Sequence, residues 1–209
     1  MKSYNCRIID HDINIDGLLD KEEWKQGEAV KLTETVTGER SRLDTEVKVL
    51  CSNSYLYFSF NCSDDYVKAS MTNYNDKLYE EDVVEVFIDD NSDLKTYVEI
   101  EVNPLNAVLH YFINNNLAGK VYGFGRIDQK VISAVTIDEK TKKWCTEIAV
   151  PLSEFVTAKN NPPLPGDRWL INFYRIDRGM DGKDEYSSWG NTGKINFHMP
   201  EKFGELVFS

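Results

Sequence analysis

Apolar and polar residues alternate along most of this chain, in short segments separated by turn-forming residues. Because successive side chains of a strand point to opposite faces, such alternation predicts β-strands with one buried face. The predicted strands cover 45–51, 54–62, 82–89, 96–103, 107–114, 130–137, 143–150, 168–177 and 203–209. Short helical turns are expected only after Asp20, which would cap the first of them, and at 152–155. We therefore predict an all-β fold, an antiparallel β-sandwich or jelly roll.

The predicted strands at 82–89 and 96–103 carry the clearest pattern. Valine or isoleucine occupies the even positions of both strands near their centres, so these side chains are predicted to face the core. The opposite faces carry Glu85, Glu99 and Glu101 beside aromatic and amide side chains. If the two strands form a hairpin with both apolar faces on one side, Glu85 lies across from Glu99 or Glu101. Like charges directly opposed in a sheet are unfavourable, so a cation, an arginine, a metal or a donor-rich ligand is expected beside them.

The composition narrows the range of partners. With 209 residues, of which 41% are hydrophobic, the chain is expected to form a single domain over 1–209. The net charge of −11, from 24 basic and 35 acidic residues, repels polyanions, so nucleic acid and anionic membranes are excluded as partners. Neutral ligands rich in hydroxyl groups and divalent cations remain open. The four cysteines have no CxxC spacing, so neither a zinc site nor a disulfide framework is expected.

The sequence also bears on the cellular compartment. No apolar run reaches the ~20 residues of a membrane span, and the first residues lack the apolar centre of a secretory signal. We expect a cytoplasmic protein if Met1 is the native start, and an extracellular protein if the sequence is that of a mature form.

Several motifs follow one another in an order that points to a known family. They are Ile15-Asp16-Gly17 with Trp24, YEEDVVEVFIDD at 79–90, YVEIEVNPLN at 97–106, EIAVPL at 147–152, YSSWG at 186–190 and FHMPEKFGEL at 197–206. This succession resembles the family 9 carbohydrate-binding modules and their stand-alone relatives, and it covers nearly the whole chain. The resemblance implies a β-sandwich of the DOMON-like type, non-catalytic binding of a mono-, oligo- or polysaccharide, and structural calcium in several members.

The resemblance also implies an aromatic clamp. In this family two tryptophans sandwich a terminal sugar, and the matching positions here are Tyr79 and Phe197. A pyranose ring has an apolar C–H face and a rim of hydroxyl groups, so a flat aromatic ring covers the former without competing for the latter. Trp189 is a further aromatic candidate, either as part of the core or as a wall of the cleft.

Polar residues of the implied site differ more from the family pattern. The strand glutamate of the family matches Glu85, and its Arg-x-Asn pair matches Glu101 and Asn103, so that glutamate replaces arginine. The late-strand glutamine matches Tyr174, or Arg175 if a bulge shifts the register by one residue. Arg175 is also a candidate counter-charge for the acidic face, and a structural salt bridge is the alternative. With these changes, the family's specificity for the reducing ends of xylan or cellulose does not carry over to this chain from the resemblance alone.

Two acidic loops are candidate calcium sites. One contains Asp89, Asp90 and Asp93, and the other, at 177–185, contains Asp181 among other acids. Calcium takes six to eight oxygen ligands, which such loops can supply. Neither loop has the spacing of an EF-hand, and a solvated turn is the alternative interpretation of each.

Two other functions remain open alongside sugar binding. One is a glycoside-active enzyme, because Glu99 and Glu101 lie two residues apart on a strand, which separates their Cα atoms by roughly 6.6 Å and is near the carboxyl spacing of inverting hydrolases. Both residues stand on one wall, however, whereas catalytic acids flank the scissile bond. The other is a sensor or protein-interaction domain on the same fold. A glycoside hydrolase acting alongside is a candidate partner.

Overall fold

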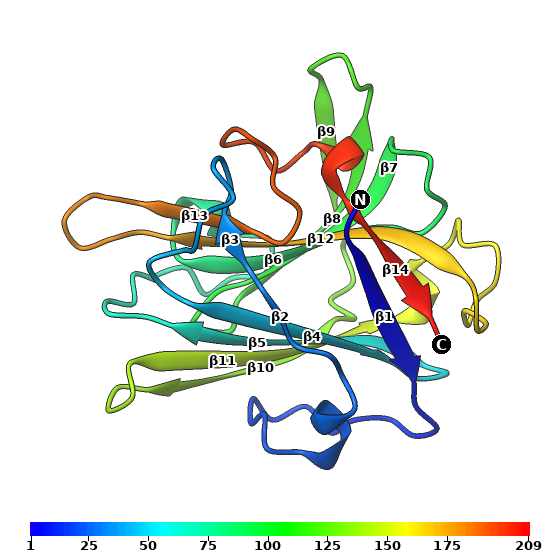
Figure 1. Ribbon diagram of the computed structural model, residues 1–209, viewed down its shortest axis with the longest axis horizontal. Helices are drawn as coiled ribbons and strands as arrows, with labels where there is room; N and C mark the ends of the chain where they lie inside the picture. Colours follow the sequence, from blue (N-terminus) through cyan, green and yellow to red (C-terminus); the bar gives the residue numbers. More distant parts are fainter.

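The computed structural model describes residues 1–209 and shows strands arranged in two facing layers (Figure 1). The strands of the first layer follow the order β10 (Ile132–Asp138), β11 (Lys143–Pro151), β5 (Tyr55–Ser63) and β4 (Thr45–Cys51), with β2 (Val30–Lys31) beside β4. Those of the second follow the order β14 (Gly204–Phe208), β12 (Arg168–Asp177), β6 (Val83–Asp89), β7 (Thr96–Val102), β8 (Val108–Asn115) and β9 (Val121–Gly125). The short strands β13 (Glu185–Ser188) and β3 (Thr33–Glu34) extend this second layer beside β12.

The first strand joins the two layers. Residues Ser3 to Cys6 of β1 (Ser3–Ile8) pair with β14, and Arg7 and Ile8 pair with β4. Both pairings are parallel, whereas all the other strand pairs are antiparallel. The predicted antiparallel β-sandwich is therefore confirmed, with β1 as the exception. All nine predicted strands are present, and the strands that the alternation missed are β1, β2, β3, β9 and β13.

Helical structure is limited to four turns of 3-10 helix, namely η1 (Glu22–Lys25), η2 (Leu78–Glu80), η3 (Leu152–Glu154) and η4 (Pro200–Lys202). The first and third lie where the sequence predicted them. Asp20 does not cap the first turn, because Lys21 occupies the cap position and no side chain binds there. No helical segment combines the length and the apolar character that crossing a membrane requires.

The main core lies between the layers and contains 29 buried residues. The even positions of β6 and β7, such as Val86 and Ile100, face this core as predicted. The register places Glu85 opposite Glu101 and Phe87 opposite Glu99, so the odd positions share the outer face of the second layer. The predicted pairing of glutamates across this hairpin is thus confirmed.

The first of the sequence motifs, Ile15-Asp16-Gly17 with Trp24, is anchored on the first layer. The side chain of Glu147 on β11 is buried and accepts hydrogen bonds from the Gly17 N–H at 2.8 Å and from Trp24 Nε1 at 2.6 Å. Lys21 Nζ donates to the same carboxylate at 2.8 Å. Residues 15–24 are therefore held on the outer face of the first layer by one fully partnered acid.

Candidate functional site

A pocket of about 390 Å³ opens on the outer face of the second layer. Side chains from β6, β7 and β8 form its floor, and residues from η2, β9, β13 and the segment 195–198 form its walls. The walls are largely aromatic, with Tyr79, Tyr111, Tyr186 and Phe197. Four of the site residues predicted from the sequence line this one pocket, namely Tyr79, Phe197, Glu85 and Glu101.

The strand register builds the floor of the pocket in rows. One row across the sheet contains Tyr174, Glu85, Glu101 and Leu109, and the next contains Phe87, Glu99 and Tyr111. Neighbouring strands lie close together in the hydrogen-bonding direction, about 4.8 Å apart. One carboxylate oxygen from each of Glu85, Glu99 and Glu101 can therefore lie within 4.8 Å of the others.

Glycines on β9 make room for the Tyr111 ring. Tyr111 faces Gly125 across the β8–β9 pair, and Gly123 faces Ile113. A Cβ atom added at Gly123 would lie 2.6 Å from Cδ2 of Tyr111, which is closer than any ordinary contact. The absence of a side chain at Gly123 thus allows the Tyr111 ring to extend over β9 and close one side of the pocket.

Phe197 is supported from behind by Tyr174. Their ring centroids lie 4.1 Å apart with planes 12° from parallel, and the Tyr174 hydroxyl donates to the Phe197 carbonyl at 2.9 Å. Tyr174 is fully buried and does not line the pocket, so it positions Phe197 instead of facing a ligand. Tyr79 on η2 is 40% exposed, and its carbonyl accepts a hydrogen bond from Arg178.

The three glutamates of the floor are buried, and two of them have carboxylate oxygens without a hydrogen-bond partner. Their exposed fractions are 2% for Glu85, 6% for Glu99 and 0% for Glu101. Oε1 of Glu85 and both carboxylate oxygens of Glu101 have no hydrogen bond within the protein. Buried polar atoms are nearly always hydrogen-bonded in folded proteins, so these oxygens are the least satisfied polar groups in the pocket.

Burial and mutual repulsion change the protonation of this cluster. Burial raises the pKa of Glu99 to about 7. Burial, followed by the negative charge of the neighbouring glutamates, raises the pKa values of Glu85 and Glu101 well above their ordinary value. The backbone N–H of Tyr79 approaches Glu101 and offsets a small part of its shift. The cluster therefore retains protons at neutral pH until something positive or rich in donors reaches it.

Arg175 does not provide the counter-charge, and that prediction is wrong. The residues of β12 pair without interruption with β6 from Leu170 to Ile176, so no bulge shifts the register. Tyr174 therefore faces outward and Arg175 faces inward, because adjacent side chains point to opposite faces. The Arg175 guanidinium is buried and donates to Asp64 at 3.0 Å and to Asp177 at 2.7 Å.

Two other predicted site residues also lie away from the pocket. Trp189 belongs to the main core, where its ring lies 5.4 Å from that of Phe173, so the prediction of a cleft wall is wrong. Asn103 follows the last residue of β7, and its side chain is fully used in the turn. Its Oδ1 accepts from the Ala107 N–H and its Nδ2 donates to the Met71 carbonyl, both at 2.9 Å.

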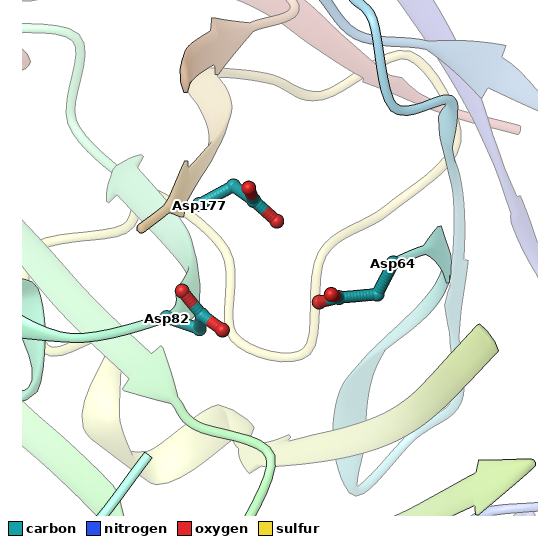
Figure 2. Close-up of side chains that lie close together, drawn as sticks. All are labelled: Asp64, Asp82 and Asp177. Atoms are coloured by element: carbon teal, nitrogen blue, oxygen red, sulfur yellow. The ribbon is translucent and has the colours of Figure 1, made fainter. Parts of the chain in front are cut away.

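A second acidic group lies at one end of the sandwich interior. Figure 2 shows Asp64, Asp82 and Asp177 pointing toward one another, with carboxylate oxygens within 4.8 Å of each other. Asp64 also accepts from Trp144 Nε1 at 3.0 Å, and Asp82 accepts from the backbone N–H of Arg178 at 2.6 Å. Since Arg175 bridges the other two acids, this group is a partnered ion-pair network of the core.

The loops predicted to bind calcium use their acids in hydrogen bonds or an ion pair within the protein. Asp89 accepts from the Leu94 N–H, Asp90 from the Thr157 N–H and Asp93 from the Thr96 N–H, at 2.9, 2.9 and 2.7 Å. Asp181 is exposed and forms an ion pair with Lys183 at 3.1 Å. Calcium binding by these residues stays a prediction.

Sequence reasoning missed Tyr111 and Tyr186 as pocket residues. Tyr111 could have been found, because its position in the alternating segment 107–114 places it on the face that carries Glu99 once the strands are paired. Tyr186 could not, because its position depends on the short strand β13 that the alternation did not reveal.

The layers and the pocket together define a β-sandwich domain with a ligand-sized pocket on the outer face of one sheet. Residues 15–209 match the family model described as carbohydrate family 9 binding domain-like, and the chain belongs to that family. No curated protein sequence matches this chain.

Solved structures share the fold over the full length. A protein of Bacteroides uniformis ATCC 8492, provisionally assigned as carbohydrate-binding, is 18% identical with a TM-score of 0.79, over 100% of this chain and 99% of its own. A family 9 module from Caldicellulosiruptor kristjanssonii in complex with cellotriose is 16% identical with a TM-score of 0.71, over 100% and 94%. A family 9 module from the same organism in complex with glucose is 18% identical with a TM-score of 0.63, over 98% and 95%. At these identities the likeness shows a common fold.

Proposed function

We propose that this protein is a non-catalytic carbohydrate-binding module that holds a terminal sugar unit in the pocket between Tyr79 and Phe197. One observation carries the proposal: aromatic rings and unpartnered, buried carboxylate oxygens line the same pocket. Membership of the family supports it, as do the two sugar complexes of family 9 modules from C. kristjanssonii that share this fold.

The chemistry of the pocket matches that of a sugar ring. The rings of Tyr79 and Phe197 can cover the C–H faces of a pyranose, while carboxylate oxygens accept hydrogen bonds from its hydroxyl groups. The volume of about 390 Å³ lies at the small end of the range for ligand pockets. A pocket of that size favours one end of an oligosaccharide over the middle of a long chain.

The arrangement of the acids supports binding in preference to hydrolysis. Glu85, Glu99 and Glu101 lie side by side on the floor formed by β6 and β7. A glycosidase needs one carboxyl group on each side of the scissile bond. A glycoside hydrolase that acts on the same polysaccharide is the proposed companion of this module.

Isothermal titration with glucose, cello-oligosaccharides and a wider sugar panel tests the proposal. Tyr79→Ala and Phe197→Ala should each lower the affinity about 10- to 100-fold, because each removes a ring that covers the sugar, worth roughly 1–3 kcal/mol. Tyr66→Ala is the matched control, since Tyr66 has a similar exposure of 42% and lies outside the pocket. Unchanged affinity in both pocket variants, or turnover of aryl glycosides that Glu101→Gln abolishes, would rule the proposal out.

A further inference from the structure

The polar part of the pocket is one-sided in charge. Glu85, Glu99 and Glu101 line it, and no lysine or arginine does. The nearest cation that affects the cluster is Arg178, which contributes to the pKa of Glu85. Arg178 is already bound to Asp184 at 2.6 Å and to the Tyr79 carbonyl. The pocket therefore presents buried acids for which none of its own side chains provides a positive counter-charge.

The hydrogen bonds that these acids lack indicate the chemistry of a ligand that would fit them. Oε1 of Glu85 and both oxygens of Glu101 are unpartnered, and they belong to side chains at least nine-tenths buried. A hydroxyl group offers one hydrogen-bond donor and no charge, whereas a protonated primary amine offers three donors and a positive charge. Hydrogen bonds between ionised partners are also roughly twice as strong as neutral ones.

The aromatic walls are compatible with a positively charged group. The faces of Tyr79, Tyr111 and Phe197 carry the negative part of the ring quadrupole, which attracts organic cations. A metal ion fits less well, because calcium requires six to eight oxygen ligands. Around the three acids, the neighbouring lining residues are apolar or aromatic, including Leu109, Ile113 and Ile176.

We propose that this pocket selects an amino sugar, a pyranose that carries a protonated primary amine, over the corresponding neutral sugar. The inference rests on the proposed function and specifies its ligand class. The amine lies against the floor formed by Glu85, Glu99 and Glu101, while the aromatic rings hold the sugar ring as they would hold a neutral sugar.

Proton release accompanies binding of such a ligand. An ammonium group favours the ionised forms of the glutamates, which otherwise retain protons near neutral pH because burial raises their pKa values. The charged and titratable groups that face these acids are Arg178, His198, Tyr79, Tyr97, Tyr111, Tyr174 and Tyr186. Burial lowers the pKa of His198 to about 4, so His198 stays neutral. The affinity should therefore rise between pH 5 and 7.

Titration calorimetry with matched sugars tests the inference. Glucose is compared at pH 6 with its 2-amino, 3-amino and 6-amino derivatives and with N-acetylglucosamine, which lacks the charge. At least one amine should bind about tenfold more tightly than glucose, and buffers of different ionisation enthalpy should reveal the released protons. Glucose binding with no amine preference would overturn this inference and leave the proposed function standing. If no sugar binds, both this inference and the proposed function are wrong.

Variants of the floor test whether the glutamates cause the preference. In Glu101→Gln and in Glu99→Gln, the ratio of amine affinity to glucose affinity should fall to about one. Glu80→Gln is the matched control, because it removes the same charge from an exposed residue beside the pocket and should keep the ratio. Glu85→Gln is the second choice if either variant unfolds. An unchanged affinity ratio in the folded floor variants would overturn the inference. An amine preference that EDTA abolishes would also overturn it, because the glutamates would then act through a bound metal.

Discussion

Two groups of three buried acids occupy different places in this molecule. Asp64, Asp82 and Asp177 lie inside the sandwich, while Glu85, Glu99 and Glu101 lie on the outer face of β6 and β7. In each group the carboxylate oxygens lie within 4.8 Å of one another. Spacing and burial are thus the same, and the groups differ in their partners.

The aspartates are bound by Arg175, by Trp144 and by backbone N–H groups, whereas oxygens of Glu85 and Glu101 have no partner. Since an unpartnered buried polar group costs free energy, the protein stabilises one group and leaves the other to a ligand. Glu147, bound by Trp24, Lys21 and Gly17, follows the first pattern. An acidic cluster alone therefore does not identify a binding site in this fold, and the proposed site differs from the aspartate group in having unpartnered oxygens that line a pocket.

Removal of the central cation of the aspartate group should give the largest effect. Arg175→Met would leave Asp64 and Asp177 buried without their ion-pair partner. The free energy of unfolding should fall by roughly 3–5 kcal/mol, as measured by urea denaturation. Arg168→Met is the control, because the pair of Arg168 with Glu205 is exposed and such pairs contribute about 1 kcal/mol or less. Equal losses of unfolding free energy in Arg175→Met and Arg168→Met would show that the aspartate group does not depend on its buried cation.

Ionisation of the glutamate group should destabilise the free protein. A carboxyl group whose pKa is higher in the folded than in the unfolded state binds its proton more tightly when folded. The free energy of unfolding therefore falls as the pH rises through this range. For Glu99 this range runs from about 4.5 to about 7. The wild type should therefore lose stability as the pH rises from 5 to 8. Glu99→Gln should lose less over the same range, by an amount on the order of 2 kcal/mol.

Comparison of the two pH profiles separates the glutamate group from the aspartates, because Asp82 and Asp177 also have raised pKa values, of about 6 and about 7, from burial. Their contribution is common to both proteins and cancels in the difference. Denaturation curves at half-unit pH intervals provide the measurement. A wild-type profile that runs parallel to that of Glu99→Gln would show that the glutamates are not strained by burial.

The sequence predicted much of this arrangement for a physical reason that is local. Alternation with a period of two sets the face of each residue in β6 and β7, so the core stripe and the row of glutamates followed from 82–89 and 96–103 alone. The positions of Tyr79 and Phe197 came from the family resemblance, because both residues lie outside the regular strands.

Other features depended on contacts between distant parts of the chain. Whether Tyr174 or Arg175 faces the glutamates depends on the register between β12 and β6, which a sequence does not reveal without knowing if a bulge is present. The isolation of the glutamates depends on Arg178 being bound to Asp184. Asn103 was predicted as the match of the family's Arg-x-Asn pair, but the strand ends at Val102 and the Asn103 side chain turns into the loop.

A smaller effect is expected from a change in the wall of the pocket that contains the glutamates. Gly123→Ala would place a methyl group 2.6 Å from the present position of the Tyr111 ring, so the ring must move. We expect a loss of sugar affinity of about fivefold with a stability cost of about 1 kcal/mol. Tyr122→Ala on the same strand is the control, because Tyr122 is exposed and does not line the pocket. An unaffected affinity in Gly123→Ala would show that Tyr111 does not contact the sugar.

The smallest effect is expected from calcium at the 89–93 loop, which is intermediate between the two acidic groups. Its acids are partnered, but by backbone N–H groups and not by a cation. A carboxylate oxygen that accepts one hydrogen bond keeps a lone pair for an ion, so weak calcium binding is expected here. At a concentration equal to its dissociation constant, calcium would stabilise the fold by about 0.4 kcal/mol. Thermal unfolding should show a rise in Tm of about one degree that EDTA reverses and Asp93→Asn removes. If 10 mM calcium leaves the Tm of the wild type unchanged, the hydrogen bonds that these acids already accept satisfy them, and the loop then belongs with the aspartates around Arg175.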